Sequence, residues 1–190
     1  MVFWRKVYPG SIRDMTVAVS TDGGTSFSPA KKIAEDNWKL DGCPDSGPAT
    51  AHTGHRVYVA WLTEASPERN GVRLTCSDDG GRTWAPATLA SQDVLDANNP
   101  SLSTADDGHV LLAFQGRDPV QRGGWNSLGV FIVEIRADGS FSKPIAVPAT
   151  PAPAIRPTIA TGTAGKFFVA WTAYSAGKPT VLLERGRREE

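Results

Sequence analysis

One eight-residue turn occurs twice in this chain, as Ser20-Thr21-Asp22-Gly23-Gly24-Thr25-Ser26-Phe27 and as Ser77-Asp78-Asp79-Gly80-Gly81-Arg82-Thr83-Trp84. Aspartate followed by two glycines is typical of a tight hairpin, because the carboxylate accepts backbone N–H bonds and glycine adopts the positive φ that other residues resist. The aromatic residue that closes each copy is placed to fill the gap between neighbouring sheets. The copies lie 57 residues apart, so the sequence predicts a repeat protein.

Two other markers recur at nearly the same interval. An aromatic residue ends an apolar run at Trp4, Trp61, Phe114 and Trp171, with spacings of 57, 53 and 57 residues. A proline opens a short strand-like segment at Pro48, Pro100 and Pro157, with spacings of 52 and 57 residues. A third, decayed copy of the turn is Ala137-Asp138-Gly139-Ser140-Phe141. The three markers therefore agree on a unit of about 55 residues.

Each unit contains four short apolar or alternating runs separated by turn residues. In the second unit these runs are Pro48–Thr53, Arg56–Thr63, Gly71–Ser77 and Ala85–Ser91, which we name strand positions A to D. No stretch carries a helical period of apolar residues with capping residues. Four antiparallel strands per unit, with aromatic and glycine residues in every repeat, are typical of a β-propeller blade.

The repeated turn resembles the Asp-box, also called the BNR repeat, and nearly all of the chain resembles the sialidase (neuraminidase) superfamily. That resemblance implies an all-β fold, a six-bladed β-propeller. The residues expected to form the two complete boxes are Ser20, Asp22, Gly24, Phe27, Ser77, Asp79, Gly81 and Trp84. Asp-boxes also occur in receptors and assembly factors, so they indicate a scaffold and not an activity.

The strand count predicts an incomplete propeller. Fourteen strands in 190 residues form about three and a half four-stranded blades of one domain, with blade portions 1–35, 36–91, 92–149 and 150–190. An open ring would expose strand edges, which favour aggregation. We favour an amino-terminally shortened chain that lacks about two blades. The alternative is a ring closed by a homodimer, although its 28 strands would make seven blades instead of six.

Composition narrows the classes of partner. Twenty basic residues balance twenty acidic ones, so nothing favours nucleic acid or an anionic membrane. The chain has no apolar run that could cross a bilayer and no signal peptide, while the resemblance implies a periplasmic or extracellular intact protein. Cys43 and Cys76 are expected a strand length apart, too far for a disulfide, with Cys76 as a buried apolar residue. We expect no metal and no cofactor.

The turns also predict which face carries function. The two boxes are C–D turns, so the B–C and D–A loops lie on the opposite face, which we call the loop face. Trp38 and Trp125 lie outside the aromatic repeat and are expected on the loop face. Such a ring is suited to stacking on a sugar; equally, each could cover the top of a blade.

The resemblance to sialidases implies particular chemistry. Sialidases use arginines to bind the substrate carboxylate, an acid/base carboxylate and a tyrosine nucleophile. The arginines expected on the loop face are Arg13, Arg69, Arg117, Arg122 and Arg156, of which Arg13, Arg117 and Arg156 are the substrate-binding candidates. The catalytic candidates are Tyr174, whose segment resembles the late tyrosine segment of the family, and Glu64 or Asp14 as the proton shuttle.

Two departures weigh against that chemistry. Ile155-Arg156-Pro157 resembles a family segment that precedes the first box in active enzymes, whereas here it follows the last box. Adjacent Arg13 and Asp14 also suit a fixed ion pair at a loop end. We therefore predict a propeller that binds a glycan or a protein through the loop face without catalysis, with an exo-α-sialidase type of glycoside hydrolase in the intact protein as the alternative.

Overall fold

The computed structural model describes residues 1–120, 124–136, 138–148 and 153–188, which form four antiparallel sheets. Sheet 1 contains β1 (Val2–Tyr8), β2 (Ile12–Ala18), β3 (Lys31–Lys32) and β4 (Trp38–Lys39). Sheet 2 contains β5 (Ala49–Thr53), β6 (Arg56–Thr63), β7 (Gly71–Ser77) and β8 (Thr88–Leu89). Sheet 3 contains β9 (Leu95–Thr104), β10 (Val110–Arg117), β11 (Gly129–Ile135) and β12 (Ile145–Ala146). Sheet 4 contains β13 (Ala154–Thr161), β14 (Lys166–Ser175) and β15 (Lys178–Arg187).

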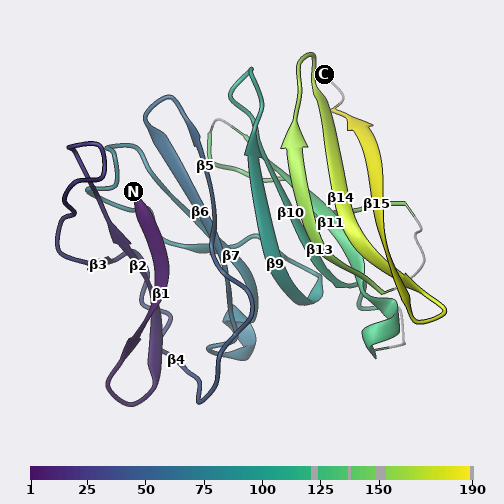
Figure 1. The fold of residues 1–190 in the computed structure, drawn as a ribbon, viewed down its shortest axis with the longest axis horizontal. Helices are drawn as coiled ribbons and strands as arrows, with labels where there is room; N and C mark the ends of the chain where they lie inside the picture. The colour runs from purple at the N-terminus through teal and green to yellow at the C-terminus, as the bar shows by residue number, and fades with distance from the viewer. Residues whose placement is uncertain (121–123, 137, 149–152, 189–190) are drawn as a thin grey trace.

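The sheets follow one another across the molecule in chain order, from the purple sheet 1 to the yellow end of sheet 4 (Figure 1). This arrangement confirms the all-β, partial propeller. In sheet 1, β3 and β4 pair with opposite ends of β2, so they are two pieces of one interrupted strand. Sheet 1 therefore has three strand positions and extends to Lys39. Sheets 2 and 3 have four strand positions each, and sheet 4 has three, so the four sheets together make about three and a half blades.

Each central strand supplies two cores at once. In β6, Val59 and Trp61 pack toward sheet 1, whereas Tyr58 and Ala60 pack toward sheet 3. Successive side chains of a strand point to opposite faces, so an unbroken apolar run suits a sheet buried on both sides. The same alternation in β10 places Leu112 and Phe114 against sheet 2, and Leu111 and Ala113 against sheet 4. The apolar runs in the sequence are thus the contacts between neighbouring blades.

The second repeated turn is held together by its aspartate. Asp79 Oδ1 accepts the backbone N–H groups of Arg82 at 2.8 Å and Thr83 at 2.9 Å. Ser77 Oγ donates to the same oxygen and accepts the N–H of Gly81, both at 2.8 Å. These bonds, above all the one from the Thr83 hydroxyl, hold the pKa of Asp79 well below its usual range. In the turn of Asp22, Ser20 Oγ and the N–H and hydroxyl of Ser26 donate to the carboxylate, and Ser20 Oγ accepts the N–H of Gly24.

The closing aromatic residues of the two turns differ. Trp84 packs edge-to-face against Phe3 of sheet 1, with ring centroids 5.8 Å apart, and so fills the gap between sheets 1 and 2 as expected. Phe27 is 48% exposed, so the expectation is wrong for this copy. Like Trp84, Phe141 of the third turn packs against a core shared with the preceding sheet, here the one between sheets 2 and 3. Within the described ranges, no helix is long and apolar enough to cross a membrane.

Candidate functional site

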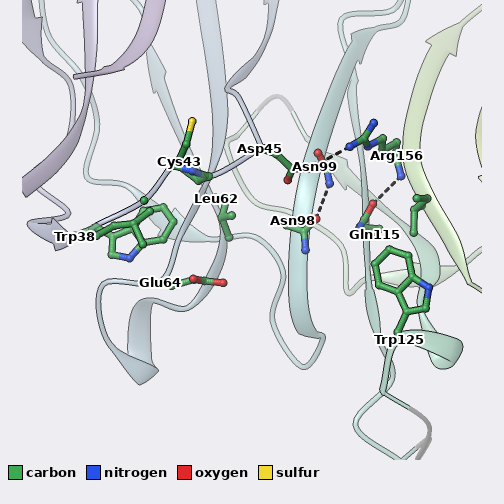
Figure 2. Close-up of a pocket in the computed structure, with 14 residues that line it drawn as sticks. Trp38, Cys43, Asp45, Leu62, Glu64, Asn98, Asn99, Gln115, Trp125 and Arg156 are labelled. Carbon is green, nitrogen blue, oxygen red and sulfur yellow. Dashed lines mark hydrogen bonds and ion pairs between the residues drawn. The ribbon is translucent and has the colours of Figure 1, made fainter. Parts of the chain in front are cut away.

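A cavity of about 490 Å³ opens on the loop face, and all four sheets contribute to its wall. Sheet 1 and the D–A segment after it supply Trp38, Cys43 and Asp45, and the end of β6 leads into Glu64. Sheet 3 supplies Asn98, Asn99, Gln115 and Trp125, and β13 supplies Arg156. Trp38 lies toward one end of the cavity and Trp125 toward the other, with the two asparagines between them (Figure 2). Its volume lies within the range of small-molecule sites.

Two residues of the cavity wall have strained backbones. Asn99 and Arg156 have φ of 51° and 52°, and each directly precedes a proline, Pro100 or Pro157. The pairing of β9 with β10 and of β13 with β14 shifts register at these places, as in a β-bulge. Bulges redirect side chains, and non-glycine residues at positive φ are concentrated at functional sites. The bulges are therefore the devices that turn both side chains toward the cavity.

Buried polar side chains hold these two bulges in place. Gln115, only 4% exposed, accepts the backbone N–H of Arg156 on its Oε1 at 2.6 Å. Ser46 Oγ, also buried, accepts the backbone N–H of Asn99 at 3.0 Å. Gln115 lies on β10 of sheet 3, the sheet before that of Arg156, and Ser46 lies in the segment that leads into β5 of sheet 2, the sheet before that of Asn99. The strained backbone is thus fixed by contacts between blades.

Arg5 does not line the cavity but holds segments of its wall in place through hydrogen bonds. It follows the repeating aromatic Trp4 just as Gln115 follows Phe114, so the two residues occupy the same position of the repeat. Its guanidinium donates to the carbonyl oxygens of Ser46 at 2.9 Å and Leu62 at 2.5 Å. Burial lowers the pKa of Arg5, and the negative charge of Asp36 counters part of that effect.

The two tryptophans outside the aromatic repeat have different environments. Trp38 is 5% exposed, and the guanidinium carbon of Arg5 lies 5.1 Å from the centroid of its ring. Trp125 belongs to the short 3₁₀ helix η2 (Gly124–Ser127) and is 58% exposed. Trp38 therefore matches the expectation of a ring that covers a blade, whereas Trp125 has free surface for a ligand.

The polar groups of the cavity are amides and carboxylates. Asn99 Nδ2 donates to Asn98 Oδ1 at 2.7 Å, and Asn98 Nδ2 donates to the carbonyl of Asp96 at 2.8 Å, so this pair is oriented by its own bonds. Arg156 forms an ion pair with Asp45 at 3.1 Å, and their side chains are 66% and 75% exposed. Glu64 is exposed and makes no hydrogen bond or ion pair with the described residues. Hydroxyl groups are suitable ligands for this set, since amides both donate and accept.

Two of the predicted arginines are engaged elsewhere. Arg13 donates to the carbonyl oxygens of Leu40 and Gly42, and Arg117 forms an ion pair with Asp96. Neither lines the cavity. Arg122 lies outside the described residues, as does Ala137 of the third turn.

Two catalytic candidates, Asp14 and Tyr174, lie away from the cavity. Asp14 is buried on the face of sheet 1 opposite the core, where it pairs with Lys32 at 2.8 Å and accepts the N–H of Asn37 at 2.8 Å. The expected Arg13–Asp14 ion pair is wrong, because adjacent strand residues point to opposite faces. Tyr174 lies on the outer face of sheet 4, since Ala173 beside it points into the core. Only Glu64 of the catalytic candidates lines the cavity.

Several residues of the site were missed in the sequence. They are Arg5, Ser46, Asn98, Asn99 and Gln115. A signal existed for Arg5 and Gln115, because each is a polar residue directly after the aromatic that ends an apolar run. Asn99 also had a signal, because it directly precedes the repeating Pro100 as Arg156 precedes Pro157.

The two cysteines are free thiols, Cys43 exposed at the cavity and Cys76 packed against the core between sheets 2 and 3, where burial raises its pKa. Cys76 is only partly buried, whereas the sequence predicted a buried residue. Among the described residues, no cluster of histidine, cysteine, aspartate or glutamate has the arrangement of a metal site.

Successive four-stranded blades with a cavity on the loop face define a sialidase-like β-propeller. Solved structures with this fold include the Hadza microbial sialidase Hz136, with 20% identity and a TM-score of 0.57 over 90% of this chain and 38% of that one. The intramolecular trans-sialidase from Ruminococcus gnavus, in complex with oseltamivir carboxylate, matches with 13% identity and a TM-score of 0.54 over 90% of this chain and 40% of that one. The GH93 α-L-arabinofuranosidase of Fusarium graminearum, in complex with arabinobiose, matches with 14% identity and a TM-score of 0.58 over 96% and 57%.

These similarities concern the fold. The chain spans 38% to 57% of the length of the three proteins, at 20% identity or less. No protein-family model and no curated protein matches the sequence.

Proposed function

We propose that this chain binds a glycan through the loop-face cavity and does not itself hydrolyse it. The observation that carries the proposal is the exposed ring of Trp125 at one end of a cavity whose polar groups include the amides of Asn98, Asn99 and Gln115. A sugar presents an apolar C–H face, which stacks on an indole, and hydroxyl groups, which match amides. An exported location, periplasmic or extracellular, is part of the same proposal.

The position of the catalytic candidates supports binding over catalysis. A sialidase needs its nucleophile and its acid/base group at one sugar ring. Tyr174 and Asp14 lie on the outer faces of sheets 4 and 1, and only Glu64 is at the cavity. The sialidase alternative is therefore the less supported of the two, and it applies to an intact protein longer than this chain.

Glycan binding is tested with the purified 190-residue chain on an array of neutral and acidic oligosaccharides, followed by calorimetric titration of the ligands found. We expect Trp125→Ala to weaken binding about fivefold or more, because loss of stacking removes about 1 kcal/mol or more. Phe27→Ala is the matched control, since Phe27 is also an exposed aromatic but belongs to a turn on the opposite face.

Three results would contradict the proposal. One is a folded protein that binds no glycan on the array, and another is binding that Trp125→Ala leaves unchanged. The third is release of 4-methylumbelliferone from its sialoside, with loss of turnover in Tyr174→Phe, which would favour the hydrolase. Binding of a protein in place of a glycan would mean that the loop face is a protein-binding surface, the other kind of ligand predicted from the sequence.

A further inference from the structure

We infer that the loop-face cavity selects uncharged glycans and disfavours acidic sugars such as sialic or uronic acids. This inference rests on the proposed function and specifies the chemical class of its ligand. It stands on the charge of the cavity wall and on the hydrogen bonds already made by the arginines around it.

The cavity wall carries more negative than positive charge. Its ionisable carboxylates are Asp45 and Glu64, and its one guanidinium is that of Arg156, which gives a formal charge of −1 for these three groups. Both carboxylates are well exposed to the cavity. An acidic sugar that enters therefore meets repulsion from two like charges and attraction from one arginine.

The other arginines nearby are already engaged. Arg5 uses its two terminal nitrogens on the carbonyl oxygens of Ser46 and Leu62 and is stacked over Trp38. Arg13 is bound to two further carbonyl oxygens, and Arg117 is paired with Asp96. A tight carboxylate site needs a planar guanidinium that is free to form two parallel bonds. Among the described residues, the cavity offers no second arginine for such a clamp.

Arg156 by itself does not reverse this balance. Its ion pair with Asp45 is largely solvent-exposed, and such pairs are weak, so Arg156 could turn toward a ligand carboxylate. The movement would leave Asp45 without its partner, and the charge of Asp45 would then oppose the same ligand, while Glu64 keeps the attraction of Arg5 behind the wall. Arg156 therefore serves mainly to neutralise Asp45.

The remaining polar groups suit hydroxyls. Asn98 and Asn99 are oriented by their mutual bond, which leaves an N–H of each and the carbonyl oxygen of Asn99 for a ligand. Gln115 holds Arg156 with its oxygen and keeps its amide N–H groups for the cavity. Glu64 accepts from a hydroxyl without cost, because a hydroxyl donates and a sugar carboxylate does not. An uncharged polyol thus satisfies every one of these groups.

The test compares neutral sugars with acidic counterparts; the galactose and galacturonate oligomers differ mainly in charge, whereas sialyllactose is lactose extended by one acidic residue. Calorimetric titrations with galactotriose and trigalacturonate, and with lactose and 3′-sialyllactose, are made at low salt. We expect the neutral member of each pair to bind at least threefold more tightly, and added salt to narrow the gap because it screens the repulsion. Glu64→Gln should narrow the gap as well, whereas Glu68→Gln, an exposed glutamate of the 3₁₀ helix η1 (Pro67–Arg69) outside the cavity wall, should not.

The outcomes separate this inference from the proposed function. Equal or tighter binding of the acidic members, with that binding lost in Arg156→Ala, would overturn the inference and leave glycan binding intact. If neither member of either pair binds, and the array shows no other neutral ligand, the proposed function is wrong and the inference is refuted with it.

Discussion

Two tryptophans of the same repeat position offer a sharp test of what holds neighbouring blades together. Trp61 and Trp171 both end the apolar run of a central strand, β6 or β14, pack toward the preceding sheet and are buried. The Nε1 of Trp61 donates to Asp36 Oδ2 at 2.6 Å, and Asp36 also accepts from Arg73 at 2.8 Å. The Nε1 of Trp171 is buried without a hydrogen-bond partner among the described residues. Replacement of each by phenylalanine therefore removes the same atoms, but only Trp61→Phe also removes a hydrogen bond.

The difference in stability between the two phenylalanine variants measures the contribution of the hydrogen bond between Trp61 and Asp36. A hydrogen bond to a charged group contributes about 1.5 to 3 kcal/mol, so Trp61→Phe should be destabilised more than Trp171→Phe by about that amount. For a chain of this size, 1 kcal/mol corresponds to about 2 to 4 °C in Tm, which predicts a gap of about 3 to 12 °C. Asp36→Ala should cost more, about 3 to 5 kcal/mol, because it leaves Arg73 and Trp61 without their buried acceptor.

The assay is thermal unfolding followed by far-ultraviolet circular dichroism, which does not depend on tryptophan emission. Wild type, Trp61→Phe, Trp171→Phe and Asp36→Ala are compared in one buffer near neutral pH. Tm values of the two phenylalanine variants that agree within 1 °C would refute the reasoning, because the bond to Asp36 would then contribute nothing. A Trp171→Phe variant less stable than Trp61→Phe would refute it equally.

Three further predictions use the same measurement. Asp79→Asn should lower the Tm at neutral pH, and the difference from wild type should shrink progressively below about pH 4. A carboxyl whose pKa is lowered by folding stabilises the protein in full above its unfolded pKa and less and less as the pH falls toward its folded pKa; a difference independent of pH would contradict this. Gly71→Ala should destabilise by about 1 to 3 kcal/mol, since φ is +132° and a Cβ would lie 2.4 Å from Ser91 Oγ; an unchanged Tm would show that the strand relaxes freely. Gln115→Leu should cost about 1 to 3 kcal/mol by leaving the Arg156 N–H unpaired, and should weaken glycan binding as well; intact binding would mean that this bulge does not shape the cavity.

The repeat could be predicted from the sequence because it depends on interactions between residues close together in the chain. Asp79 and the glycines after it form the expected turn, since the carboxylate and the N–H groups it binds lie within four residues. The apolar runs ending at Trp61 and Phe114 form the expected central strands for the same reason: alternation along one strand needs no knowledge of its neighbours. The side of the molecule that carries the cavity followed from the order of the turns.

The site was predicted less well, because its residues act across sheets. Glu64, Arg156, Trp38 and Trp125 line the cavity as their loop positions suggest, but only the packing of Arg5 over Trp38 decides that this ring is covered. Asp14 was misplaced because one step along a strand turns a side chain to the other face.

The sequence by itself determined the blade: short strands, aspartate turns at a regular interval, and aromatic residues that match one sheet to the next. Tertiary structure alone decided the chemistry of the cavity, since Asn99 and Arg156 face it only through bulges that Ser46 and Gln115 hold from another blade or its loop. The physical reason is the distance along the sequence between the residues that bond. A turn is stabilised by bonds between residues a few positions apart, whereas these acceptors lie 53 and 41 residues from the groups they bind.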